Sequence, residues 1–201
     1  MAQSVVFAQN LKAHLEMMTQ LSSLESDIHY MIKCMHMCFE AGGKILIAGN
    51  GGSASDAQHF ASEFTGRFNA PNRQALAAIA LTTDISAITS ISNDFGFEFI
   101  FSRQLEALAK PQDIFIGITT SGNSPNIIRA VDYAHQQKIQ SFVLSGKSGG
   151  KLNALLCEKN IVVPSQETAR IQEAHIFIIH YICQYFDELY ALETVENLES
   201  K

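Results

Sequence analysis

The chain has 201 residues, of which 47% are hydrophobic and 17% charged, and its formal net charge is −6. This length is sufficient for one α/β domain with a substantial core. Proteins that bind nucleic acids usually carry a basic stripe, whereas the 14 Lys and Arg residues here are scattered along an acidic chain. Direct binding to DNA or RNA is therefore not expected.

Neither secretion nor membrane insertion is expected. The N-terminal segment has no basic region followed by an apolar one, as a secretory signal would. The longest apolar segment, residues 175–186, contains His180 and Gln184 and is too short to cross a bilayer. The cysteines form no CxxC pair and lie in apolar stretches, which indicates free, buried thiols in a reducing compartment. We therefore expect a cytoplasmic protein.

The first part of the chain predicts two helices. Apolar residues recur at helical spacing over residues 4–20 and again over 23–41. Ser22 with Glu25 three residues later has the pattern of a capping box for the second helix, and Gly42 ends it. These helices lie outside the strand–helix alternation that follows, so we expect their apolar faces to pack against another subunit.

From residue 44 onward, short apolar runs alternate with helical segments. Strands are expected at 44–48, 76–81, 113–118, 140–145 and 160–163, and helices at 54–66, 84–93, 98–109, 125–137 and 168–192, with a short helix after residue 150. This alternation predicts a three-layer αβα sandwich with a five-stranded parallel sheet. We expect one domain over 1–201, with two N-terminal helices in 1–42 and the α/β core in 43–195.

Two polar loops follow predicted strands, where open α/β sheets bind their ligands. The first contains Asn50-Gly51-Gly52 before a helix, which suits close approach of a ligand to the backbone but also suits a plain tight turn. The second, residues 119–124, has four hydroxyl side chains, one glycine and no lysine before a helix. Hydroxyls and a helix N-terminus are what a phosphomonoester site needs when no cation is used, although a Ser/Thr-rich cap would look similar.

Two histidines are candidates for chemistry. His59 and Glu63 are four residues apart on one helical face, a spacing that suits a metal, an acid–base pair or a simple surface interaction. His180 lies among isoleucines in the last helix, where it is either functional or a core histidine bonded to a backbone carbonyl.

Four segments together resemble the phosphoheptose isomerases, which are enzymes of the sugar isomerase (SIS) domain family. They are GNGGSASDAQHFASEFTGRF, SNDFGFEFIFSRQLEAL, TTSGNS and PSQETARIQEAHIFIIH, and the resemblance covers roughly residues 40–190. It implies an SIS fold, a homotetramer, and conversion of D-sedoheptulose 7-phosphate to D-glycero-D-manno-heptose 7-phosphate. This is the first step of bacterial ADP-heptose or GDP-heptose synthesis for lipopolysaccharide.

The resemblance also implies roles for individual residues. It assigns catalysis to Glu63 and His180, and it implies a zinc ion but no nucleotide cofactor. The implied phosphate ligands are Thr119, Thr120, Ser121 and Ser124; the implied sugar contacts are Asn50, Gly51, Gly52, Glu63, Asn93, Asp94 and Gln172; and the implied zinc ligands are His59, Glu63, Gln172 and His180. Two positions depart from the family pattern: Thr119, where Ser is frequent, and Ala169, where some members have a polar residue.

A geometric condition applies to the zinc ligands, because Gln172 and His180 are separated by about 12 Å of helix rise. Their side chains converge only if they lean toward each other or if a neighbouring subunit supplies one pair. We therefore expect His59, Glu63 and His180 to be the principal ligands.

The expected reaction proceeds through an enediol, with Glu63 as base and His180 as acid. One alternative is a non-catalytic SIS protein that binds a partner such as a replication initiator. Those relatives lack an acid at the position of Glu63, so its presence here favours an enzyme. A second alternative is an isomerase of another phosphosugar.

Overall fold

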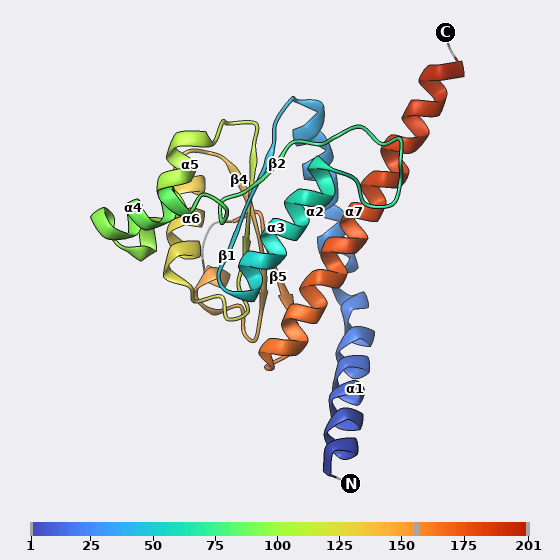
Figure 1. Ribbon diagram of the computed structural model, residues 1–201, viewed down its shortest axis with the longest axis vertical. Helices are drawn as coiled ribbons and strands as arrows, with labels where there is room; N and C mark the ends of the chain where they lie inside the picture. Colours follow the sequence, from blue (N-terminus) through green and yellow to red (C-terminus); the bar gives the residue numbers. More distant parts are fainter. Residues whose placement is uncertain (1, 155–156, 200–201) are drawn as a thin grey trace.

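A computed structural model describes residues 2–154 and 157–199 and contains a five-stranded parallel sheet with the strand order β2-β1-β3-β4-β5 (Figure 1). The strands are β1 (Ile45–Gly49), β2 (Ala78–Ala80), β3 (Ile114–Ile118), β4 (Gln140–Gly146) and β5 (Lys159–Val163). Helices cover both faces of the sheet, so the predicted three-layer αβα sandwich is confirmed.

The helices divide between the two faces. On one face lie α1 (Ala2–Gln20), α2 (Glu25–Glu40), α3 (Gly52–Thr65) and α7 (Thr168–Glu199); on the other lie α4 (Ile85–Phe95), α5 (Ser102–Leu108) and α6 (Pro125–Gln136). Short 3-10 turns occur at Leu21–Leu24, Phe97–Phe99 and Gly150–Ala154. The expected helix over 98–109 is therefore two pieces, and the expected strand over 76–81 has only three residues in the sheet.

Alternation along the central strands builds two separate cores. In β1, Ile45 and Ile47 pack into the core shared with α2, α3 and α7, whereas Leu46 and Ala48 pack into the core shared with α5 and α6. All these side chains are fully buried. A strand buried on both faces is a continuous apolar run, and this is the pattern by which β1 is predicted from the sequence.

The strand order determines where a ligand can bind. β1 and β3 are paired neighbours, with Gly49 beside Ile118 at their carboxyl ends, and the chain crosses to opposite faces of the sheet after them. The crevice outside such a pair of strands is the usual ligand position in open α/β sheets. The two predicted loops therefore lie next to each other.

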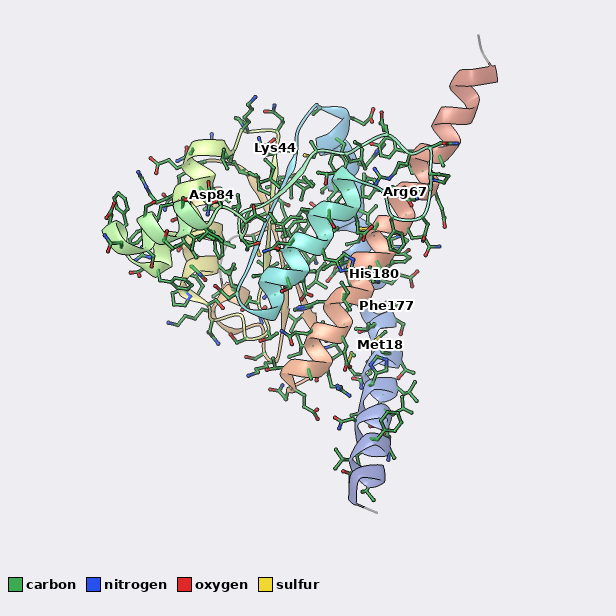
Figure 2. The ribbon with its side chains drawn as sticks, viewed as in Figure 1. Met18, Lys44, Arg67, Asp84, Phe177 and His180 are labelled. Atoms are coloured by element: carbon green, nitrogen blue, oxygen red, sulfur yellow. The ribbon has the colours of Figure 1, made fainter. Side chains whose placement is uncertain are left out.

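The expectation that both N-terminal helices lack a partner within the chain is wrong for α2. Ile28, Met31 and Met35 of α2 are buried in the core of the same chain. In α1, Met17 is buried in the same core, whereas Phe7 and Leu15 are 71% and 56% exposed. Met18, near the end of α1, lies beside Phe177 of α7, where α1 meets α7 (Figure 2).

The predicted capping box at Ser22 is also wrong. The chain passes from α1 into α2 through the 3-10 turn, with Gln20 and Leu24 both in right-handed helical conformation. No extended N-cap residue is formed, and the Ser22 hydroxyl donates to the Thr19 carbonyl instead. The predicted end of α2 is correct, because Gly42 has a φ of +70° directly after the helix.

The cysteines are free, as expected. Cys34, Cys38 and Cys183 are buried, Cys157 is half-buried, and burial raises the pKa of the Cys38 thiol to about 11. Within the part of the chain that the structure describes, no helix has the length and apolarity needed to cross a membrane.

Candidate active site

The glycine turn after β1 is tied to the neighbouring loop by an amide pair. Gly51 has a φ of +56°, which favours glycine, and α3 begins at the next residue. The Asn50 side chain donates to Asn126 Oδ1 over 2.9 Å, and Asn126 Nδ2 donates back to Asn50 Oδ1 over 2.8 Å. Asn126 is buried in the first turn of α6, so this reciprocal pair fixes the turn against the second loop.

The second loop has the features of an anion site. Its Thr119 and Ser124 hydroxyls lie 3.0 Å apart, and Ser124 precedes Pro125 at the start of α6 without capping the helix through its side chain. Gly122 has a φ of +66° and packs so closely on Gly149 that an added Cβ would lie 1.9 Å from the Gly149 carbonyl oxygen. The loop is thus held in one shape, with hydroxyls grouped at a helix N-terminus where partial positive charge collects.

Gln172 joins the glycine turn and not the histidines. Its amide lies against Gly52, where an added Cβ would be 2.3 Å from Gln172 Nε2. The N-terminal part of α7 therefore meets the first turn of α3. The structure places Asn50, Gly51, Gly52 and Gln172 in one region together with the hydroxyl loop.

A second group lies further along α3 and α7. His59 Nε2 is 3.0 Å from Glu63 Oε1 and 3.5 Å from His180 Nε2, so His59 stands between the two predicted catalytic residues. The Phe68 ring packs on the His180 imidazole with 5.4 Å between centroids. Figure 2 shows His180 on α7, and Arg67 lies in the exposed loop that follows α3.

The donor atoms of this group suit a cation. His59 Nε2 carries either one hydrogen or one lone pair, yet it faces both a carboxylate oxygen and a second imidazole nitrogen. Nitrogen ligands about 2.0–2.1 Å from a tetrahedral zinc lie about 3.4 Å apart, which is close to the separation of the two imidazoles. Among the described residues, however, no three His, Cys, Asp or Glu side chains are already arranged as a metal site.

Asn93 and Asp94 are not part of either group within this chain. They lie exposed in the last turn of α4, where the Asn93 amide donates to Asp94 Oδ1 over 2.8 Å. α4 is at the outer edge of the opposite helical layer, well away from α3 and α7 in Figure 1. Within one chain, these two residues do not reach the loops or the histidines.

Three neighbours of the site were not predicted from the sequence. Asn126 and Phe68 contact predicted site residues directly, as described above. Asp56 lies one turn before His59, and burial raises the pKa of its carboxyl above the ordinary value. The nearby His59 imidazole opposes this rise but is the smaller effect. Asn126 follows the proline that starts α6, which is the one sequence feature that could have indicated it.

Comparison with known proteins identifies the family. The SIS domain family model matches residues 7–146. "Phosphoheptose isomerase 1" of Campylobacter jejuni is 59% identical over 151 residues, which are 75% of this chain and 80% of that protein. The solved phosphoheptose isomerase GmhA of Neisseria gonorrhoeae is 42% identical with a TM-score of 0.86, and a phosphoheptose isomerase of Francisella tularensis is 38% identical with a TM-score of 0.89. Both structures cover 94% of this chain, which covers 100% of each of them. The chain belongs to the SIS domain family and, within it, to the phosphoheptose isomerases.

Proposed function

We propose that this chain interconverts D-sedoheptulose 7-phosphate and D-glycero-D-manno-heptose 7-phosphate. The observation that carries the proposal is the meeting of Glu63, His59 and His180 between α3 and α7, in a phosphoheptose isomerase fold. A carboxylate and imidazoles supply the base and acid that a ketose–aldose conversion needs.

The reaction moves one proton from C1 to C2. Glu63 takes the proton from C1, which leaves an enediol whose C1 and C2 each carry one oxygen. His180 gives a proton to C2, while the hydroxyl proton passes from the oxygen on C1 to the oxygen on C2. Proton exchange with solvent then returns Glu63 to the carboxylate and His180 to its protonated form. His59 contacts both Glu63 and His180 and so fixes the position of one side chain relative to the other.

The hydroxyl loop binds the phosphate in this proposal. Thr119, Thr120, Ser121 and Ser124 donate to the phosphate oxygens, and the N-terminus of α6 adds its free N–H groups. Asn50 and Gln172 lie beside this loop and contact the sugar hydroxyls, while Asn93 and Asp94 contact the sugar from a neighbouring subunit.

We also propose that zinc is held by His59, Glu63 and His180, with Gln172 as a further ligand only if a neighbouring subunit supplies it, because Gln172 of the same chain lies against Gly52. Two imidazole nitrogens and a carboxylate oxygen support this choice of metal. A bound zinc would polarise the oxygens on C1 and C2.

We infer a homotetramer whose active sites are shared between subunits. About 16 Å of rise along α3 separates Gly52 from Glu63, and about 12 Å of rise along α7 separates Gln172 from His180. Residues from a second subunit would close that distance. The exposed apolar side chains of α1 support assembly, because such faces are usually covered in oligomers.

The proposed enzyme acts in the cytoplasm, in the first step of ADP-heptose or GDP-heptose synthesis for lipopolysaccharide. Its free, buried thiols suit a reducing compartment.

The direct test is to incubate the purified chain with sedoheptulose 7-phosphate and to follow the aldose product by NMR. A parallel incubation with fructose 6-phosphate tests an isomerase of another phosphosugar. Turnover of the heptulose in preference to the hexulose is expected. Turnover of neither sugar would overturn the proposal and favour a non-catalytic role.

A further inference from the structure

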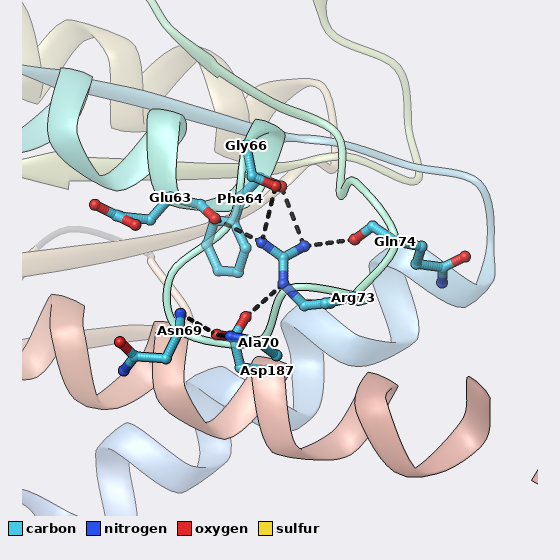
Figure 3. A network of polar contacts seen from close by, with 8 residues as sticks. All are labelled: Glu63, Phe64, Gly66, Asn69, Ala70, Arg73, Gln74 and Asp187. Carbon is cyan, nitrogen blue, oxygen red and sulfur yellow. Dashed lines mark hydrogen bonds and ion pairs between the residues drawn. The ribbon is translucent and has the colours of Figure 1, made fainter. Parts of the chain in front are cut away.

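Arg73 and Asp187 form a buried ion pair beside the proposed catalytic group. Arg73 lies in the loop between α3 and β2, Asp187 lies on α7, and the two residues are only 6% and 3% exposed. Arg73 Nε donates to Asp187 Oδ1 (Figure 3). Buried charges are costly to leave unpaired, so each residue fixes the other in place.

The guanidinium group also caps the end of α3. It donates to the Glu63 carbonyl over 2.6 Å and to the Phe64 carbonyl over 3.2 Å, with Gly66 at 3.4 Å (Figure 3). The last carbonyls of a helix have no partner within the helix, and a cation is favourable at that end. The backbone of Glu63 is therefore held directly by Arg73.

The carboxylate of Asp187, the other member of the pair, holds the loop segment that packs against His180. Asp187 lies nearly two turns beyond His180, on the same side of α7. Its Oδ2 accepts from the backbone N–H groups of Asn69 and Ala70. These two residues directly follow Phe68, whose ring packs on the His180 imidazole.

We propose that Arg73 and Asp187 are positioning residues that set the geometry between Glu63 and His180. The pair connects the backbone of Glu63, the proposed base, to α7, which carries His180, the proposed acid. It also holds the residues next to Phe68, whose ring packs on His180. This inference rests on the proposed isomerase function. Small displacements of reacting groups cost large factors in rate, so a change in this network should lower kcat more than it changes KM.

The first test variant is Arg73→Lys. Lysine keeps the positive charge beside Asp187, but its three donors share one nitrogen and cannot span both Asp187 and the carbonyls that the three nitrogens of the planar guanidinium reach. We expect kcat to fall by roughly 10-fold to 100-fold with KM within about twofold. A second variant, R73M/D187L, replaces the whole pair by apolar side chains, which often preserves folding, and it should show the same loss of kcat.

A matched control exists at the opposite end of β1. Lys44, which is labelled in Figure 2, pairs with the buried Asp113. Asp113 also accepts from the backbone N–H groups of Lys44 and Lys110. The double variant K44M/D113L removes a similar network away from the ligand loops. It should lower the Tm by a comparable amount and leave kcat per folded molecule unchanged.

Three outcomes separate the possibilities. Wild-type protein without turnover would overturn the proposed function itself. Wild-type turnover together with full kcat in folded Arg73→Lys and R73M/D187L would overturn the positioning role alone. A loss of kcat in K44M/D113L equal to that in R73M/D187L, at the same change in Tm, would also overturn it, because the effect would then follow stability.

Discussion

Replacing Glu63 with Gln removes the proposed base and retains the shape of the side chain. The Glu63 side chain is 19% exposed, and its Oε1 lies 3.0 Å from His59 Nε2. A glutamine oxygen can accept the same hydrogen bond, so the free energy of unfolding should change by only about 1 kcal/mol. Loss of a general base lowers kcat by roughly 10²–10⁴, which corresponds to about 3–5 kcal/mol in the activation barrier.

The assay follows sedoheptulose 7-phosphate by NMR in deuterated water, with urea unfolding of each variant in parallel. Wild-type turnover should place deuterium at C2 of the product if the abstracted proton exchanges with solvent. Glu106→Gln is the control, because the Glu106 carboxylate also has a side-chain hydrogen-bond partner, Arg103, but lies on the exposed surface of α5. Near-wild-type turnover by Glu63→Gln would show that Glu63 is not the base.

Four further results are expected. The double substitution Ser121→Ala and Ser124→Ala should raise KM about tenfold or more, because each hydrogen bond to a charged group contributes about 1.5–3 kcal/mol, and an unchanged KM would remove the phosphate assignment. Protein shown by elemental analysis to be free of metal should lose activity and regain it with zinc; full activity without metal would exclude an essential role. Light scattering should show a tetramer that Leu15→Glu dissociates, and an active wild-type monomer would contradict shared active sites. Burial lowers the pKa of His175 to about 4, so the unfolded chain takes up a proton at higher pH than the folded chain does. Up to about 3 kcal/mol of the free energy of unfolding is therefore present above pH 6.5 and is lost as the pH falls toward 4. Equal urea midpoints at pH 7.5 and 5.0 would contradict this.

The sheet and the two polar loops that follow β1 and β3 could be predicted because their patterns are local. The central strands are apolar runs between polar turns, and each loop follows its strand directly in the sequence. Adjacency of the loops then follows from the strand order, since parallel strands end at the same edge. His59 and Glu63 could be paired for the same reason, because four residues place them on one helical face.

Contacts between distant parts of the chain were not predictable in this way. α2 has the same helical periodicity whether it covers a sheet or another subunit, so its burial within the chain was missed. Arg73 and Asp187 are 114 positions apart, and neither stands in a recognisable motif. The separation of Gln172 from His180 was anticipated from helix rise, but the contact between Gln172 and Gly52 depends on how α7 crosses α3.

The reciprocal amide bonds between Asn50 and Asn126 have a consequence for how this sequence can evolve. Each side chain presents one donor and one acceptor, so the two match as the edges of a base pair do. Aspartate at either position would set two acceptors against each other at a buried site, whereas a change at both positions could restore a match. Among descendants of this sequence, the two positions should therefore change together or not at all.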